Sequence, residues 1–177
     1  MGRTYSWVLV ATASGLLASS TLRAQELPKP GPEHEHFKQL VGTWDATVKG
    51  FGGESKGTMV YKLDVGGIWL VGNFKGEFGG MPFEGKGLDT FDSRTKKYVG
   101  VWVDSMSTTP LVMSGDFDKA TGTMTMIGEG RGMDGNMVKM KSVTKMESPD
   151  AITFTMIGPG PDGKDSEMIK IHYKRRS

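Results

Sequence analysis

The chain has 177 residues, with 22 basic and 20 acidic side chains, 26 glycines and no cysteine. The absence of cysteine excludes disulfides, thiolate metal sites, cysteine nucleophiles and a lipidated cysteine anchor. The near balance of charges removes the main electrostatic argument for nucleic-acid binding, so we expect no nucleic-acid partner.

Residues 1–24 have the parts of a secretory signal peptide. Arg3 supplies the positive charge, residues 7–17 are apolar, and small residues end at Ala24, after which we expect cleavage. An uncleaved anchor is the alternative, but the stretch is short for a bilayer, which needs roughly 20 apolar residues. Removing 24 of the 177 residues leaves 153 with 20 basic and 20 acidic side chains, because Arg3 and Arg23 are lost. We therefore expect a neutral, exported product, periplasmic or secreted, with no stable membrane insertion.

A proline-rich leader over 25–32 precedes a single domain over 33–175. The domain opens with helix signals over 32–41, where Pro32 suits the first position and Gly42 suits the C′ position. So short a helix needs a docking surface, and an open barrel end would supply one. His34 and His36 are two apart on this helix and so point to different sides, which predicts a solvated helix start rather than a metal site. The basic residues 174–176 are likewise expected to be a solvated terminus.

From residue 43 to residue 173, short runs of alternating apolar and polar residues recur between glycine, asparagine, aspartate and proline turns. This pattern predicts about ten antiparallel strands. Their expected ranges are 44–51, 56–65, 68–75, 83–91, 97–104, 110–117, 123–128, 137–146, 151–157 and 167–174. Short links favour an all-β up-and-down barrel over a sandwich, whose crossovers need longer connections.

The alternation assigns residues to faces without saying which face is internal. In the last strand, Ile169, Ile171 and Tyr173 share one face, and His172 lies on the other. A β-bulge, which Gly87 or Gly100 would mark, could also change the parity along a strand.

Several motifs resemble a known bacterial family. The Gly42-Thr43-Trp44 motif after a short helix resembles lipocalins and nitrobindin-like barrels. Residues 66–70, 85–92, 97–99 and 102–107, with the leading residues 31–34, are similar to the family called domain of unknown function 1579. The resemblance runs from about residue 31 to residue 173 and implies an exported calycin-like barrel with no established activity. It supplies no catalytic residues.

The candidate site residues are aromatic, thioether and polar side chains that could face a barrel interior. Trp44 is expected to plug the closed end, as its counterpart does in the resembled families. The candidate ligand-binding residues are Trp69, Trp102, Asp104, Met113, Met126, Met140, Met156 and His172. The methionines are either core filler or the wall of an adaptable cavity, and residues 104–109 either line the barrel mouth or form local turns.

No catalytic residue is expected, because serine, histidine and aspartate are present without an informative motif around the histidines and no metal-binding cluster is evident. The favoured function is non-enzymatic binding of a small apolar molecule inside the barrel. One alternative is a haem-binding protein that uses His172, which lies near the C-terminus like the haem ligand of nitrobindins. The other is a surface-interaction module without a ligand. The pattern leaves the ligand and the oligomeric state open.

Overall fold

The computed structural model describes residues 27–50, 53–132, 135–160 and 162–177. A 3₁₀ turn η1 (Pro32–His34) and a helix α1 (Glu35–Leu40) come before the strands, and a second 3₁₀ turn η2 (Val65–Gly67) lies between β2 and β3. The strands are β1 (Gly42–Gly50), β2 (Gly53–Asp64), β3 (Trp69–Phe78), β4 (Met81–Asp92), β5 (Lys97–Asp104), β6 (Ser107–Asp118), β7 (Thr123–Arg131), β8 (Met137–Ser148), β9 (Ala151–Pro159) and β10 (Asp165–Arg175). The signal peptide predicted over 1–24 lies outside the described residues, as does part of the predicted leader.

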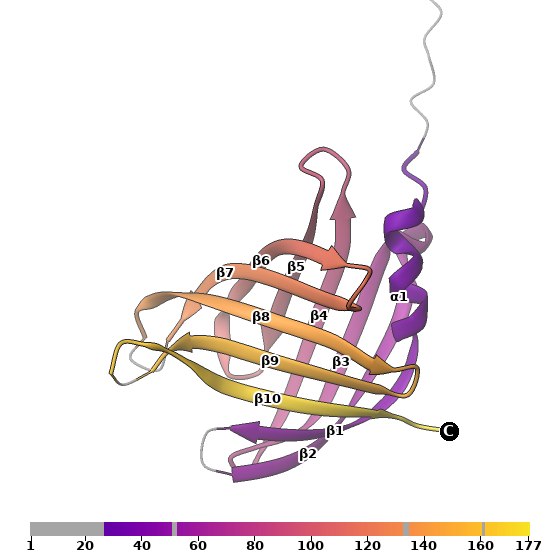
Figure 1. The fold of residues 1–177 in the computed structure, drawn as a ribbon. Helices are drawn as coiled ribbons and strands as arrows, with labels where there is room; N and C mark the ends of the chain where they lie inside the picture. The colour runs from indigo at the N-terminus through magenta and orange to yellow at the C-terminus, as the bar shows by residue number, and fades with distance from the viewer. Residues whose placement is uncertain (1–26, 51–52, 133–134, 161) are drawn as a thin grey trace, which may run out of the picture.

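The strands form one closed antiparallel barrel in which each strand pairs with its neighbours in the chain. β1 closes the sheet by pairing with β10, from Trp44 opposite Arg175 to Gly50 opposite Ile169. Figure 1 shows the strands wound around a common interior, with α1 on the side to which the end of β10 points. The up-and-down barrel is therefore confirmed, and the sandwich alternative is wrong.

The observed strands match the ten predicted ones but are longer at most of their ends. The N-terminal helix is shorter than its pattern predicted, because residues 32–34 form a 3₁₀ turn and the α-helix ends at Leu40. Gly42 is not the C′ residue of the helix but the first residue of β1, with φ of 132°. The pairing of Gly42 with Tyr61 begins the sheet there.

The prediction of a β-bulge at Gly87 or Gly100 is wrong. The register runs without a break through Gly87 opposite Trp102 and through Gly100 opposite Met113. Register shifts occur instead between Trp102 and Asp104 and at two places near the ends of β8 and β10. Gly100 has a packing reason instead, because a Cβ there would lie 2.4 Å from Oδ1 of Asp89.

Glycines on the inner face make room for large side chains. A Cβ at Gly85 would lie 2.1 Å from Cζ2 of Trp102, and a Cβ at Gly57 would lie 2.3 Å from Cζ of Phe74. A Cβ at Gly72 would lie 2.8 Å from Cε1 of Tyr61. In the interior, glycines thus lie next to large aromatic side chains, and this packing lets the barrel hold many aromatic rings.

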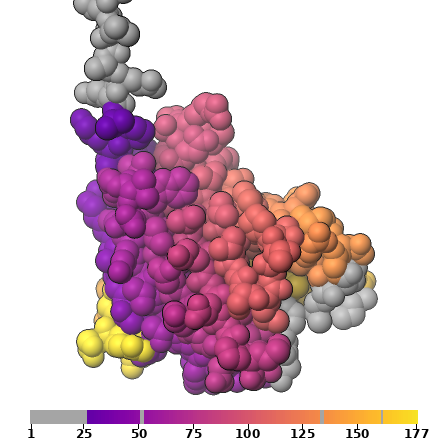
Figure 2. Space-filling view, turned by 180° about the vertical axis from the view of Figure 1, so that it is seen from behind, coloured from indigo at the N-terminus to yellow at the C-terminus, as the bar shows by residue number. Residues whose placement is uncertain are grey.

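The barrel wall is continuous on the side seen in Figure 2, where the magenta to red residues of β3 to β6 form most of the face turned to the viewer. The buried core behind it includes Trp44, Leu70, Phe74, Met126 and Tyr173. Among the described residues, no helix is long and apolar enough to cross a membrane.

Candidate functional site

Trp44 lies where the first strand meets α1, at the closure of the sheet by β1 and β10. Trp44 has no solvent exposure, and its indole Nε1 donates a hydrogen bond of 2.8 Å to the carbonyl of Leu40. The helix end is therefore tied to the first strand by a buried donor that would otherwise be unsatisfied. Leu40 also packs against the core around Trp44.

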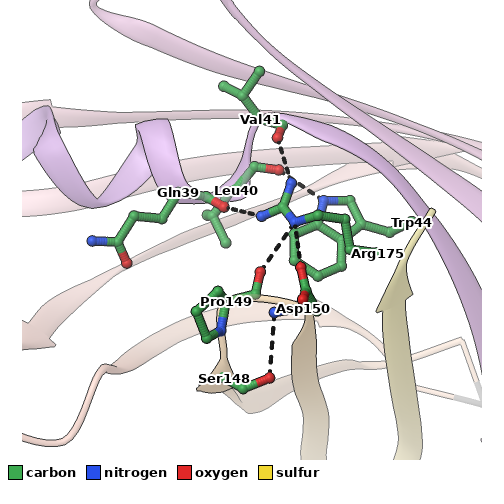
Figure 3. Close-up of polar contacts among 8 residues, drawn as sticks. All are labelled: Gln39, Leu40, Val41, Trp44, Ser148, Pro149, Asp150 and Arg175. Carbon is green, nitrogen blue, oxygen red and sulfur yellow. Dashed lines mark hydrogen bonds and ion pairs between the residues drawn. The ribbon is translucent and has the colours of Figure 1, made fainter. Parts of the chain in front are cut away.

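Arg175 holds this closure together from the last strand (Figure 3). Its guanidinium donates hydrogen bonds to the carbonyls of Gln39, Val41 and Pro149, over 2.5, 2.8 and 3.0 Å. It also lies 4.0 Å from the ring centroid of Trp44. A cation at the C-terminal end of α1 satisfies carbonyls that the helix leaves unpaired. The expectation of a solvated basic terminus is thus wrong for Arg175.

The histidines at the start of the helix are not solvated, which corrects the expectation for this segment. His34 is buried, and His36 stacks on Phe117 with the ring centroids 4.2 Å apart and the planes at 17°. Burial lowers the pKa of His36 from its usual 6.5 to about 4, against the opposing hydrogen bond with the Glu33 carbonyl. Among the described residues, no three histidine, aspartate or glutamate side chains are placed to hold a metal ion.

Among the described residues, one cavity lies inside the barrel, and a second, between the barrel and α1, meets it at shared residues. The first has a volume of about 220 Å³, and its walls include Trp102, Phe74, Met113, Phe154 and Met156. The second, of about 950 Å³, lies between the barrel and α1 and extends to the turns after β6 and β8. Tyr61, Asp89, Met126 and Thr144 line both.

Asp89 is the acidic group at this junction. It lies on β4 between Leu70 of β3 and Gly100 of β5, and its side chain is enclosed by the barrel. Burial raises the pKa of its carboxyl from the usual 3.8 to about 7. A Cβ at Gly100 would lie 2.4 Å from Oδ1 of Asp89, so glycine at that position is what gives the carboxyl its space.

Two tyrosines share the interior with Asp89. Burial raises the pKa of Tyr61 well above its usual value, and the charges of Tyr173 and Asp89 add to this rise. Burial also raises the pKa of Tyr173. Both phenols are therefore neutral at physiological pH and offer hydroxyl groups instead of charge.

The structure brings four of the predicted ligand-binding residues together around the first cavity. Trp102, Met113, Met126 and Met156 line it. Met140 is buried in the adjoining core cluster with Met113 and Met126. The predicted residues thus come from β5, β6, β7, β8 and β9, which a linear sequence separates but a barrel gathers.

Trp69, His172 and Asp104 do not lie among the cavity walls. Trp69 alternates with Leu70 and so faces away from the interior, half-buried. His172 is exposed on the outer face of β10, where its Nδ1 lies 3.4 Å from Oγ1 of Thr153. Its side chain is therefore not placed to ligate a haem inside the barrel. Asp104 accepts hydrogen bonds from the Trp102 indole over 2.9 Å and from the Met106 amide, which is local turn chemistry.

The sequence reading missed Asp89 and Tyr61. A signal for Asp89 was present, because it shares its parity on β4 with Phe83 and Phe91, which puts a carboxyl on an apolar face. Glycines at 85 and 87 obscured that pattern by breaking the alternation. Tyr61 offered no comparable signal, since tyrosine is common on either face of a strand.

The fold and the cavities define a closed antiparallel β-barrel with an interior large enough for a small molecule. The family model described as "Protein of unknown function (DUF1579)" matches residues 29–175, and the chain belongs to this family. The resemblance found in its sequence motifs is thereby confirmed. No curated protein matches the chain in sequence.

Solved structures share the fold at low sequence identity. Rv2717c from M. tuberculosis superposes with a TM-score of 0.63 at 13% identity, over 83% of this chain and 99% of that one. A de novo designed fluorescence-activating β-barrel has a TM-score of 0.44 at 18% identity, over 78% and 95% of the two chains. The redesigned barrel mFAP0, solved bound to DFHBI, also has a TM-score of 0.44, at 19% identity and over 77% and 99%. These likenesses concern the fold alone.

Proposed function

We propose that this chain is an exported, non-enzymatic protein that binds a small, mainly apolar molecule inside its barrel. The observation that carries the proposal is the cavity of about 220 Å³ walled by Phe74, Trp102, Met113 and Phe154. An apolar molecule that enters such a space leaves water for aromatic and thioether surfaces, which is favourable in proportion to the area buried.

The second cavity supports the proposal by giving the first a neighbour through which a ligand can extend. It is bounded by α1 and by the turns after β6 and β8, and it shares Tyr61 and Met126 with the first. Methionine walls adapt to ligands of different outline because the side chain is unbranched and flexible.

The proposal is tested with two adjacent residues that face opposite sides of the wall. Leu111 lines the first cavity, whereas Val112 is 54% exposed on the outside. Leu111→Trp is expected to reduce the affinity for 1-naphthylmethanol by at least about tenfold, because the indole takes the space of the probe. Val112→Trp is the matched control and should leave the affinity unchanged.

Binding is measured by titration calorimetry on the purified protein, with thermal unfolding to confirm that both variants fold. Wild-type protein that takes up no naphthyl probe would contradict the proposal, as would equal affinities of the two variants.

Export is the part of the proposal that comes from the sequence of residues 1–24 alone. Expression of the full chain in a bacterial host, followed by cell fractionation and mass measurement, tests it. We expect a product in the exported fraction whose first residue is Gln25. A product of full length in the cytoplasm would contradict export without touching the binding proposal.

A further inference from the structure

Asp89 is a carboxyl group inside the barrel without a partner of opposite charge. Within residues 27–50, 53–132, 135–160 and 162–177, no hydrogen bond or ion pair reaches it. A buried carboxylate without compensation is costly, and folded proteins normally pair such a group. An unpaired carboxyl is therefore a candidate for a group that a ligand completes.

Asp89 faces the interior of the barrel. It lines both cavities, so the carboxyl stands at their junction. Oδ1 packs over Gly100, where a Cβ would lie 2.4 Å from it, whereas a Cβ at Gly87 would lie 3.8 Å from Oδ2. The carboxyl thus rests against a glycine of β5, and a group in the interior can approach it from the side that faces the cavities.

None of the other charged groups in the described walls of these two cavities forms an ion pair with Asp89. In the first cavity Glu77 has the same sign of charge. In the second, Arg175 is engaged by backbone carbonyls and Asp150, and Glu35, His36 and Lys119 belong to the helix side and the turn after β6. Burial raises the pKa values of Tyr61 and Tyr173, so both phenols are neutral at physiological pH.

Aromatic rings surround the space in front of the carboxyl. Trp102 lies over Gly85 and near Gly87, four and two residues before Asp89 on the same inner face of β4. Phe74 and Tyr61 add further rings to the same wall. Aromatic faces attract cations as well as apolar groups, so a ring-lined site with one carboxyl suits a cation that is itself attached to an apolar body.

We propose that the ligand is an apolar molecule that carries a protonated amine, with the ammonium group against Asp89 and the hydrocarbon among Trp102, Phe74 and the methionines. This inference rests on the proposed function and adds the chemical class of the ligand. The ammonium supplies the charge that Asp89 lacks, and the carboxylate accepts a charge-assisted hydrogen bond from it.

Three probes with one ring system and different charges test the inference. They are 1-naphthylmethylamine, which is a cation, 1-naphthylmethanol, which is neutral, and 1-naphthylacetate, which is an anion. The amine is expected to bind the wild-type protein at least about tenfold more tightly than the alcohol at about pH 8.5, and the acetate more weakly than either.

Two variants test whether Asp89 causes the preference for the amine over the alcohol. Asp89→Asn keeps the shape of the side chain and should remove the preference of the amine over the alcohol. Asp116→Asn is the matched control, because Asp116 is exposed on β6 and pairs with Lys97 outside the barrel. It should keep the preference.

A measurement on the wild-type protein alone covers the case in which Asp89→Asn fails to fold. At about pH 6.5, part of the Asp89 population is protonated, because its pKa is about 7. Binding of the amine should then release up to about one proton, seen by calorimetry in buffers of different ionisation enthalpy. The alcohol should release none.

The outcomes separate this inference from the proposed function. If the alcohol binds but the amine binds no better, or releases no proton, the amine inference is overturned and the binding function stands. Preference for the acetate, or a preference for the amine that survives in Asp89→Asn, also overturns it. If none of the three probes binds, the proposed function itself fails.

Discussion

The guanidinium of Arg175 lies over the indole of Trp44, with 4.0 Å between the guanidinium carbon and the ring centroid. The two residues are also opposite each other in the pairing of β1 with β10 that closes the barrel. Trp44 and Arg175 bind neighbouring carbonyls at the end of α1, those of Leu40 and of Gln39 and Val41. The pair therefore joins the first strand, the last strand and the helix at one point.

Replacing Arg175 by Met is expected to lower the free energy of unfolding by about 2–4 kcal/mol. The change keeps the aliphatic stem but leaves the carbonyls of Gln39, Val41 and Pro149 without their donor. Urea unfolding followed by tryptophan fluorescence measures the loss. Arg175→Lys should recover only part of it, because an ammonium lacks the planar fork of donors.

The control for this change is Arg94→Met, in the exposed turn after β4. We expect its effect to stay within about 0.5 kcal/mol, as for most surface substitutions. Equal effects of the two substitutions would show that the contacts of Arg175 add nothing to stability.

Gly85→Ala is expected to destabilise the protein by about 1–3 kcal/mol, because the new methyl group overlaps the ring of Trp102. The near-ultraviolet circular dichroism of the indole should change as the ring moves. Gly53→Ala is the matched control, since a Cβ there meets nothing within 4 Å. A native-like spectrum and stability for Gly85→Ala would contradict the packing of Trp102 over this glycine.

Because of Asp89, the free energy of unfolding should decrease as the pH rises. The pKa of about 7 in the folded state lies above the usual 3.8, so between these values the folded protein binds more protons than the unfolded chain. Raising the pH through this window therefore destabilises the fold, by up to about 4 kcal/mol for a shift of this size. Asp89→Asn should remove this dependence and be more stable than wild type at about pH 8.5.

Urea unfolding at a series of pH values measures the effect, with Asp116→Asn as the control that should follow the wild-type curve. A wild-type curve and an Asp89→Asn curve that remain parallel from about pH 5 to about pH 8.5 would contradict it.

Because of His36, the free energy of unfolding should decrease as the pH falls, which is the opposite of the effect of Asp89. Its pKa falls from the usual 6.5 to about 4 in the folded protein, so within this window the unfolded chain binds more protons. Lowering the pH therefore destabilises the fold. His36→Phe preserves the stacking on Phe117 and should lose less stability between about pH 6.5 and about pH 4 than wild type. The exposed His172→Phe is the control, and equal acid sensitivity of His36→Phe and wild type would refute the prediction.

The strands could be read from the sequence because each one follows a period of two and is bounded by turn residues. The ten predicted segments appear as β1 to β10, and the Gly-Thr-Trp motif lies at the start of the first. The ends were less accurate. The paired strands continue past the apolar runs, for example at Gly53 and Ser107, where backbone pairing and not side-chain pattern sets the limit.

The site was predicted only in part, because alternation divides residues into two faces without naming the inner one. Trp102 and Trp69 have similar sequence contexts, yet one lines the cavity and the other faces outward. His36 at the helix start shows the same limit, since its ring packs against Phe117 and Tyr98 from strands far along the chain.

The approximate number of strands and their antiparallel order could be predicted from the sequence, because local periodicity and turn chemistry are written in consecutive residues. The family came from the resemblance of its motifs and from the family model over residues 29–175. The binding of Arg175 to the helix end and the position of Asp89 in the cavities beside Gly100 became evident only from the three-dimensional structure. Both depend on side chains brought together by closure of the sheet. The physical reason is that closure gives each strand one inner face, and which face turns inward is set by packing around the whole barrel.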